Sequence, residues 1–213
     1  MKITAFGATG AIGRMVVERL LDAGHTVTAY VRTPSKVPAE WAGRVTTVVG
    51  EITDAKAIDS AITGADAVVS ALGPTMDRTA TGLPLADGNR LIVASMEKHG
   101  VRRYVGNGTP SLLDERDTPT VQTRLVGWMA RTFLPRAYRE MLAMSRAVTE
   151  SGLDWTIVRF IAPKDGPAQG VKKVGFFGTD GIGWRVTRAD IAAFTAAQVD
   201  DDRYLKAAPA ISN

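Results

Sequence analysis

A group of glycines near the N-terminus constrains the fold more than any other feature of this sequence. The segment Gly7-Ala8-Thr9-Gly10-Ala11-Ile12-Gly13 has the spacing G-x-x-G-x-x-G. It follows a β-rich run at residues 2–6 and opens an amphipathic helical pattern at residues 11–23. In a strand–turn–helix unit, such glycines allow a tight turn, close approach of the backbone to a pyrophosphate, and packing of the helix on the sheet. The whole segment is therefore predicted to bind a dinucleotide, with the helix amides facing its phosphates.

Strand and helix patterns alternate along the chain. Further strands are expected at residues 26–31, 45–49, 66–72, 103–106 and 155–160, and helices at 85–99, at 120–150 with an interruption at Pro135, and at 190–199. This β-α-β alternation predicts an α/β fold of the Rossmann type, a doubly wound parallel sheet with helices on both faces. We expect a single domain over residues 1–213, with a cofactor half at about 1–110 and a smaller substrate-side elaboration at about 110–213.

Local signals predict three details of this fold. Thr53 is expected to cap the short helix that Gly64 ends. Residues 162–183, rich in Gly, Pro and Lys, are expected to form a loop or lid over the site. The segment Thr187–Asp190 resembles a capping box, and residues 203–206 are expected to form a short last strand.

Composition excludes several kinds of site. The chain has no cysteine and only two histidines, which excludes disulfides, thiol catalysis, thiolate zinc sites and three-histidine metal sites, so no metal is expected. The net charge is +4, and the basic residues are scattered along the chain rather than clustered, so no nucleic-acid partner is expected. Neither a signal-like leader nor a run of about 18 apolar residues is present, so we expect a cytoplasmic protein without a membrane partner. The oligomeric state is left open, a homodimer included.

A cation stands at the end of the second strand, where NAD-binding folds use an acid. Arg32 ends this strand and Lys36 follows in the next turn. Both would suit the 2′-phosphate of NADP, and we expect NADP(H) to be preferred over NAD(H). The alternative is that Arg32 is an ordinary surface residue.

Two later turns have positions that suit a cofactor. Glu51 and Ile52 follow the third strand, near the expected adenine site, and Ala71, Leu72 and Gly73 end the fourth strand, on the ribose side. Either segment could equally be an ordinary turn.

Several segments together resemble the atypical short-chain dehydrogenase/reductases. They are GATGAIGR, LLDAGHTVTAYVR, GADAVVSALGP, SGLDWTIVRF, VTRADIAAF and KAAPAISN, in this order across nearly the whole chain. The combination is similar to the NmrA-like NAD(P)H-binding subgroup, which includes flavin reductases of the biliverdin reductase B type. This resemblance implies NADPH as cofactor and a planar conjugated acceptor such as a flavin, a quinone or a tetrapyrrole.

The resemblance also indicates site residues. It implies cofactor contacts at the ends of the fifth and sixth strands, at Asn107, Gly108, Phe160 and Ile161. It puts Thr109 at the hydroxyl position beside the nicotinamide, with Ser111 as the near alternative, and Ser145 where relatives carry a stronger acid or base. Tyr138 is the further catalytic candidate. The alternative for each of these side chains is a purely structural role, as a turn residue, a helix residue or a packing residue.

The sequence departs from the dehydrogenase pattern of the wider superfamily. Neither Tyr138 nor Tyr104 is followed by a lysine four residues on, since Leu142 and Gly108 stand there, so the Tyr-x-x-x-Lys proton-transfer pair is missing. The leading hypothesis is an NADPH-dependent reductase of a planar small molecule, which needs mainly to hold the nicotinamide against the acceptor. A redox sensor that binds NADP(H) without turnover is the alternative, and the missing pair counts against an isomerase or epimerase.

Apolar and basic residues of the second half are candidates for the acceptor pocket. The candidate walls are Trp128, Met129, Phe133, Phe160, Phe176, Phe177 and Trp184. The arginines Arg124, Arg131, Arg136 and Arg139 could attract an anionic acceptor such as FMN, or could belong to a solvated helix face.

Overall fold

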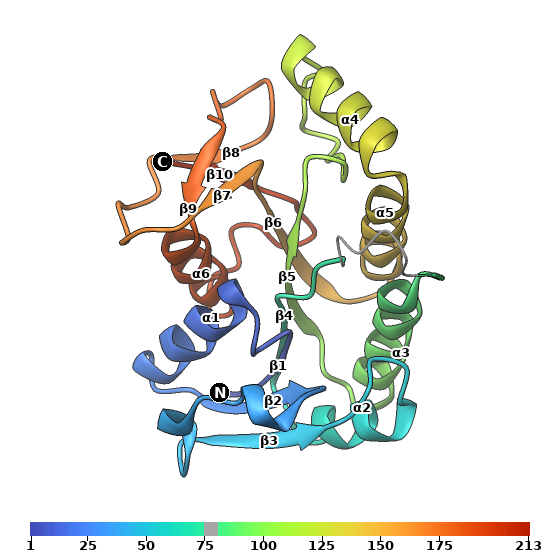
Figure 1. Ribbon diagram of the computed structural model, residues 1–213, viewed down its shortest axis with the longest axis vertical. Helices are drawn as coiled ribbons and strands as arrows, with labels where there is room; N and C mark the ends of the chain where they lie inside the picture. The colour runs from blue at the N-terminus through green and yellow to red at the C-terminus, as the bar shows by residue number, and fades with distance from the viewer. Residues whose placement is uncertain (75–80) are drawn as a thin grey trace.

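A computed structural model describes residues 1–74 and 81–213 of the chain, the side chain of Gln122 excepted, and a large central sheet organises it (Figure 1). The strands of this sheet are β1 (Lys2–Phe6), β2 (Thr26–Val31), β3 (Val45–Val49), β4 (Ala67–Ser70), β5 (Arg103–Gly108), β6 (Asp154–Arg159), β8 (Lys173–Gly175) and β10 (Ala210–Ser212). Their order is β3-β2-β1-β4-β5-β6-β10-β8, and neighbours are parallel except for β8, which is antiparallel to β10. The predicted Rossmann-type parallel sheet is confirmed.

Helices cover both faces of the sheet, as predicted. They are α1 (Ala11–Asp22), α2 (Ala55–Ile62), α3 (Pro84–Lys98), α4 (Val121–Phe133), α5 (Pro135–Thr149) and α6 (Arg188–Ala197). α1 packs with α6 on one side, while α2, α3 and α5 form the layer on the other side (Figure 1). α4 lies beyond the sheet and packs on α5. Pro135 separates α4 from α5 as expected, since proline is favourable at a first helical position and unfavourable inside a helix.

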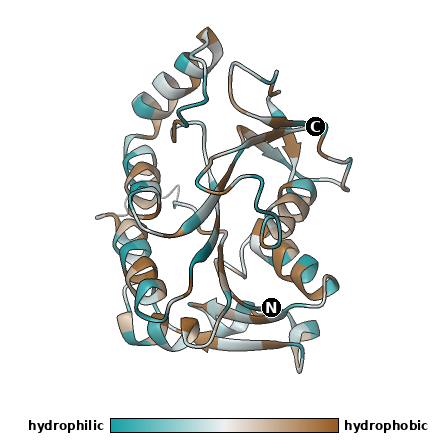
Figure 2. Ribbon diagram, turned by 180° about the vertical axis from the view of Figure 1, so that it is seen from behind, coloured by the Kyte–Doolittle hydropathy of each residue, from teal (hydrophilic) through white to brown (hydrophobic). Residues whose placement is uncertain are grey.

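The alternation of side chains along β1 builds two cores. Ile3 and Ala5 pack toward α1 and α6 with Leu20, whereas Phe6 packs toward α2 and α3 with Ile92. All five side chains are buried. Figure 2 shows hydrophobic and hydrophilic residues interspersed along the helices that cover the sheet. Because parallel strands are covered on both faces, their carboxyl ends form one edge, where ligands bind in such folds.

Two expected helix starts are shifted. α2 is capped by Asp54, whose carboxylate accepts the N–H groups of Lys56 and Ala57 at 3.0 Å, so the expectation of Thr53 as the cap is wrong by one residue. An aspartate suits this position because its carboxylate also complements the helix dipole. α6 begins at Arg188, two residues earlier than expected, and Thr187 caps it as predicted by accepting the Asp190 N–H at 3.1 Å.

The last part of the chain differs most from expectation. Residues 203–206 form turns rather than a strand, and the last strand is β10. The predicted loop at 162–183 contains β8 and also β7 (Ala162–Lys164), which pairs with β9 (Arg185–Thr187) in a separate two-stranded sheet. Strands of three residues are too short for their periodicity to be recognised. Among the described residues, none of the helices has the length and hydropathy needed to cross a membrane.

Candidate functional site

The glycine-rich turn between β1 and α1 leaves no space for a side chain at two of its positions. Gly7 has a φ of +70°, and a Cβ there would lie 2.7 Å from the carbonyl carbon of Ala71. At Gly13 a Cβ would lie 2.1 Å from the carbonyl oxygen of Gly7. The glycines therefore bring the start of α1 against the ends of β1 and β4, as the motif predicts.

The amino end of α1 suits an anion. Its cap residue, Gly10, has no side chain to satisfy the first amides, and the first turn contains no acidic residue. These backbone N–H groups and the helix dipole can bind phosphate oxygens.

A cavity of about 460 Å³ opens at this turn and is called here the first cavity. It runs along the carboxyl ends of the strands, and its volume is in the range of small-molecule sites. Its lining residues are Gly7, Thr9, Gly10, Tyr30, Val31, Arg32, Thr33, Lys36, Gly50, Glu51, Ile52, Thr53, Ala71, Leu72, Gly73, Pro84, Leu85, Arg136 and Glu140.

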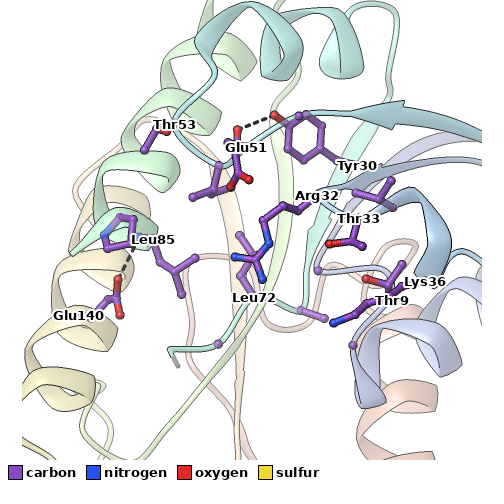
Figure 3. A pocket seen from close by; sticks show the side chains of 18 of the residues that line it. Thr9, Tyr30, Arg32, Thr33, Lys36, Glu51, Thr53, Leu72, Leu85 and Glu140 are labelled. Atoms are coloured by element: carbon purple, nitrogen blue, oxygen red, sulfur yellow. Dashed lines mark hydrogen bonds between the residues drawn. The ribbon is translucent and has the colours of Figure 1, made fainter. Parts of the chain in front are cut away.

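Arg32 reaches into this cavity from the end of β2 (Figure 3). Lys36 and Thr9 lie on one side of it, and Leu85 and Glu140 lie on the opposite side. Arg32 and Lys36 are exposed and belong to no ion pair in the part of the chain that the structure describes. Their positive charge is therefore available to a bound anion.

A second cavity, of about 280 Å³, lies over the end of β5. Its lining residues are Pro110, Ser111, Leu113, Asp114, Asp117, Thr118, Pro119, Thr123, Arg124, Gly127, Tyr138 and Phe177. Two predicted catalytic residues, Ser111 and Tyr138, are thus brought together. Thr109 lines neither cavity, and its hydroxyl accepts the Ser111 N–H at 3.4 Å.

The start of α5 stands between the two cavities. Arg136 and Glu140, one helical turn apart, line the first cavity, and Tyr138 lines the second. The strands below are also neighbours, because Ser70 of β4 pairs with Gly106 of β5. The chain that continues from β4 lines the first cavity, and the chain that continues from β5 lines the second. A ligand in one cavity would therefore lie next to a ligand in the other.

Comparison with known proteins agrees with this geometry. A family model described as NAD(P)H-binding matches residues 7–202, which is most of the chain. The chain belongs to the NAD(P)H-binding family. The NAD(P)H-binding family that the resemblance implied is thereby confirmed.

Two curated relatives of this NAD(P)H-binding protein carry reductase names. The (4-alkanoyl-5-oxo-2,5-dihydrofuran-3-yl)methyl phosphate reductase of Streptomyces griseus is 31% identical over 176 residues, covering 81% of this chain and 53% of the relative. The isoflavone reductase homolog IRL of Zea mays is 28% identical over 223 residues, covering 95% of this chain and 65% of the relative. The chain thus spans between half and two thirds of the length of these relatives.

Solved structures share the fold. A short-chain dehydrogenase/reductase of Veillonella parvula, solved in complex with NADP, has a TM-score of 0.78 and 20% sequence identity. The match covers 100% of this chain and 94% of that one. At this level of identity, the similarity concerns the fold.

The residues of the first cavity fit a dinucleotide. The missing side chains at Gly7 and Gly13 let the turn pack closely against α1 and the end of β4, and the uncapped α1 provides phosphate donors. Asn107, at the end of β5, lines neither cavity: its amide nitrogen donates to Thr195 of α6 at 2.9 Å, and its side-chain oxygen is buried without a hydrogen-bond partner among the described residues.

Not every predicted cofactor residue lines the first cavity. Those that do are Gly7, Thr9, Gly10, Arg32, Lys36, Glu51, Ile52, Ala71, Leu72 and Gly73, whereas Ala8, Ala11, Ile12, Gly13, Asn107, Gly108, Phe160 and Ile161 do not. Ala8 is buried in the core, and Phe160 and Ile161 pack against smaller hydrophobic clusters. Direct contact of these residues with a cofactor stays a prediction.

Arg14 supports the site and escaped the sequence analysis. Its guanidinium donates to the carbonyl oxygen of Thr9 at 3.2 Å and to that of Lys36 at 2.8 Å. It thereby ties the glycine-rich turn to the 3-10 turn that carries Lys36. Arg14 ends the segment GATGAIGR, so its position in that motif was the available signal.

Tyr30 was likewise missed. Its hydroxyl donates to the carbonyl oxygen of Glu51 at 2.7 Å and fixes the turn after β3 (Figure 3). Burial, reinforced by the negative charges of Asp54 and Glu51, raises the pKa of Tyr30 to about 12. The hydroxyl therefore stays protonated and keeps donating at physiological pH.

Glu140 is the third functional side chain that was missed, and it has no sequence signal. It is fully buried, and its Oε1 accepts the Leu85 N–H at 3.0 Å (Figure 3). The cap residue of α3, Leu83, offers no side-chain acceptor, so Glu140 of α5 caps α3 from outside. Arg136 pairs with it at 3.4 Å.

Most of the expected acceptor-pocket walls lie elsewhere. Of that set, only Phe177 lines the second cavity. Trp128, Met129 and Phe133 are exposed on α4, and Trp184 is also exposed. Ser145 is buried within α5. Of the four expected arginines, Arg124 lines the second cavity and Arg136 the first.

Proposed function

We propose that this protein reduces a planar conjugated small molecule, such as a flavin or a quinone, with NADPH. The observation that carries the proposal is the pair of cavities on either side of the start of α5. The first has the anion-binding turn and cations that a dinucleotide phosphate needs. The second combines apolar side chains such as Leu113 and Phe177 with several hydroxyl and charged groups, as the site of a small acceptor can. A cytoplasmic location is part of the same proposal.

A preference for NADP(H) over NAD(H) follows from the end of β2. Arg32 stands where NAD-specific folds carry the acid that binds the ribose hydroxyls. Its guanidinium can bind a 2′-phosphate with two hydrogen bonds, and Lys36 adds a second positive charge. The Veillonella parvula structure in complex with NADP supports this choice by analogy of fold.

In this proposal, some residues of the chain bind the cofactor and the acceptor, and others supply a proton. NADPH, when bound, supplies a hydride. The glycine-rich turn and Arg32 would fix the cofactor, and the second cavity would hold the acceptor against it. The reduced acceptor also takes up a proton, and of the hydroxyl residues that line the second cavity, Ser111 and Tyr138 are our candidates to pass it on. Without a Tyr-x-x-x-Lys pair, these hydroxyls would pass a proton from water rather than abstract one.

The names of the curated relatives support a reductase. The Streptomyces griseus and Zea mays proteins are named as a reductase and a reductase homolog. The alternative is a redox sensor that binds NADP(H) and acts through a protein partner. The absence of the Tyr-x-x-x-Lys pair is what favours it.

Oxidation of NADPH by the purified protein tests the proposal. The acceptors are FMN, riboflavin, several quinones and biliverdin, with NADH in parallel. We expect turnover with NADPH, and about a tenfold or greater loss of kcat in Ser111→Ala and Tyr138→Phe. Thr109→Ala is the comparison within the same turn, and its effect should be smaller because Thr109 lines neither cavity. Tight NADPH binding without oxidation by any acceptor would instead support the sensor.

A further inference from the structure

Helix α4 stands apart from the body of the protein. It projects beyond the end of the sheet, with α5 as the helix it packs against (Figure 1). None of its 13 residues is buried, among those whose side chains the structure describes. A helix is ordinarily stabilised by burying one apolar face, so the exposed state of α4 needs an explanation.

The exposed surface of α4 is apolar. Val121, Leu125, Trp128, Met129 and Phe133 follow one another at steps of four, three, one and four residues, which puts them on one face of the helix. The side chains are markedly exposed, at 84% for Val121, 58% for Trp128 and 62% for Phe133. Trp128 and Phe133 pack edge to face, with ring centroids 6.1 Å apart. We call this face the α4 stripe.

The charged residues of α4 and of the chain segments directly before and after it are all basic. Residues 118–139 contain four arginines and no acidic residue. Arg124 and Arg131 are exposed and lie seven residues apart, along one edge of the stripe. In the part of the chain that the structure describes, neither of them pairs with a carboxylate. The face therefore combines a large apolar surface with positive charge that is not neutralised.

We propose that the α4 stripe docks on the surface of an anionic phospholipid membrane. An amphipathic helix with Trp and Phe on one face and arginines beside it lies in the headgroup region, with its apolar face among the acyl chains. The arginines would be attracted by the negative surface potential. Docking of this kind needs no membrane-spanning segment, so it replaces the expectation of no membrane contact.

A second copy of the chain fits this face less well. In a twofold dimer the same patch meets itself. The α4 stripes would then bring Arg124 and Arg131 of both copies to one interface, with no acid between residues 118 and 139 to pair with them. Like charges at an interface are unfavourable, so charge complementarity favours the membrane.

Membrane docking would also bear on the acceptor. Thr123, Arg124 and Gly127 of α4 line the second cavity. A docked bilayer would lie beside this cavity, and a lipid-soluble acceptor such as a quinone could enter from it. This consequence rests on the proposed reductase function, whereas the docking itself does not.

Vesicle flotation tests the docking without any measurement of activity. The full chain is mixed with vesicles of phosphatidylcholine alone, or with about a third of phosphatidylglycerol. We expect binding to the anionic vesicles only, a blue shift of the tryptophan fluorescence, and release at high salt, because the Debye length falls to about 3 Å at 1 M. The double variant Trp128→Ser/Phe133→Ser should bind at least about tenfold more weakly, and Arg131→Glu several-fold more weakly.

Two control variants carry the same changes elsewhere on the surface. Trp184→Ser removes another exposed tryptophan, and Arg185→Glu reverses another exposed arginine. Both should bind like the unchanged chain. Absence of binding to anionic vesicles, or equal loss in the controls, would overturn the proposal. So would a concentration-dependent dimer that Trp128→Ser/Phe133→Ser abolishes, since this would assign the α4 stripe to a second copy.

Discussion

Asp117 and Arg159 form a two-point ion pair behind the second cavity. The Oδ2 of Asp117 lies 2.5 Å from one terminal guanidinium nitrogen of Arg159, and its Oδ1 lies 2.8 Å from the other. Arg159 is completely buried and stacks on Phe177, with 4.8 Å between the guanidinium carbon and the ring centroid. Because Asp117 and Phe177 both line the cavity, this pair holds the cavity wall onto the end of β6.

Breaking this pair should destabilise the protein strongly. Asp117→Asn removes the charge and leaves the buried guanidinium uncompensated, so we expect a loss of about 3–5 kcal/mol in the free energy of unfolding. Urea denaturation measures it. Arg102→Ala is the matched control, because Arg102 makes a similar pair with Asp154 at the surface. That pair should be worth less than about 1 kcal/mol, and an equal loss in both variants would contradict the prediction.

Asp190 should make stability depend on acidic pH. Its burial raises the pKa of the carboxyl, but hydrogen bonds from Thr187, Gln169, Asn213 and Gly170 outweigh burial and lower the pKa below its ordinary value. The ionised form therefore favours the folded state. Its contribution is present at neutral pH and is lost as the pH falls below about 3.9, the ordinary pKa of aspartate, toward the lower pKa of the folded state.

Urea denaturation between pH 7 and pH 3 checks this dependence. The unchanged protein should lose more stability over this range than Asp190→Asn, whose side chain does not titrate. Asp22→Asn is a suitable control, because Asp22 is exposed and pairs only loosely with Arg19, at 3.9 Å. Parallel curves for the unchanged protein and Asp190→Asn would show that this carboxylate does not contribute.

Arg32→Ala should weaken NADPH binding and leave NADH binding nearly unchanged. The guanidinium is expected to bind the 2′-phosphate, which NADH lacks, and a charged hydrogen-bonded contact is worth about 10- to 100-fold in affinity. Fluorescence titration with each cofactor measures both dissociation constants. Arg19→Ala, at an exposed arginine that lines neither cavity, should change neither. Equal weakening for both cofactors would contradict the assignment of Arg32 to the 2′-phosphate.

Gly13→Ala should damage both the fold and cofactor binding. Its new methyl group would meet the carbonyl oxygen of Gly7, so the start of α1 must move away from the turn. Overpacking of this kind costs about 1–3 kcal/mol. Gly127→Ala provides the control, since a Cβ there meets no atom within 4 Å and alanine favours a helix. Chemical denaturation should show a lower free energy of unfolding for Gly13→Ala and no loss for Gly127→Ala. NADPH titration should show weaker binding for Gly13→Ala alone.

Glu140 should act mainly through its hydrogen bond to α3. Glu140→Ala leaves the Leu85 N–H without its acceptor and should cost about 1–3 kcal/mol. Glu140→Gln keeps an acceptor oxygen and should recover most of this loss. Thermal unfolding of the two variants makes the comparison. A glutamine variant as unstable as the alanine variant would show that the charge pair with Arg136 matters more than the cap.

The sequence predicted those parts of the protein in which one local pattern decides the structure. The glycine spacing at residues 7–13 and the alternation up to β5 indicated the parallel sheet and the first cavity, because turn geometry and side-chain period are local properties. The ends of β2 and β4 predicted Arg32 and Leu72 as lining residues, since carboxyl ends of parallel strands share one edge.

What escaped prediction depends on contacts between distant segments. Glu140 meets Leu85 across 55 residues, and Arg14 meets Lys36 across 22. No local pattern records such pairs. β10 was missed for a similar reason, because three residues become a strand only by pairing with β6 and β8. The exposed face of α4 could not be anticipated either, since Trp128 and Phe133 suit a core helix equally well.

Because β10 lies between β6 and β8 in the sheet, its late position in the chain also sets the order in which the strands can pair during synthesis. Among the strands that the structure describes, β8 pairs in the main sheet with β10 only, with Val174 opposite Ile211 and Lys173 opposite Ser212. The strands from β3 to β6 can therefore align while the chain is still emerging from the ribosome. β8 has to wait until residues 210–212 are released. Until then the free edge of β6 is open to another strand, so a nascent chain that stalls late would be most vulnerable to aggregation there.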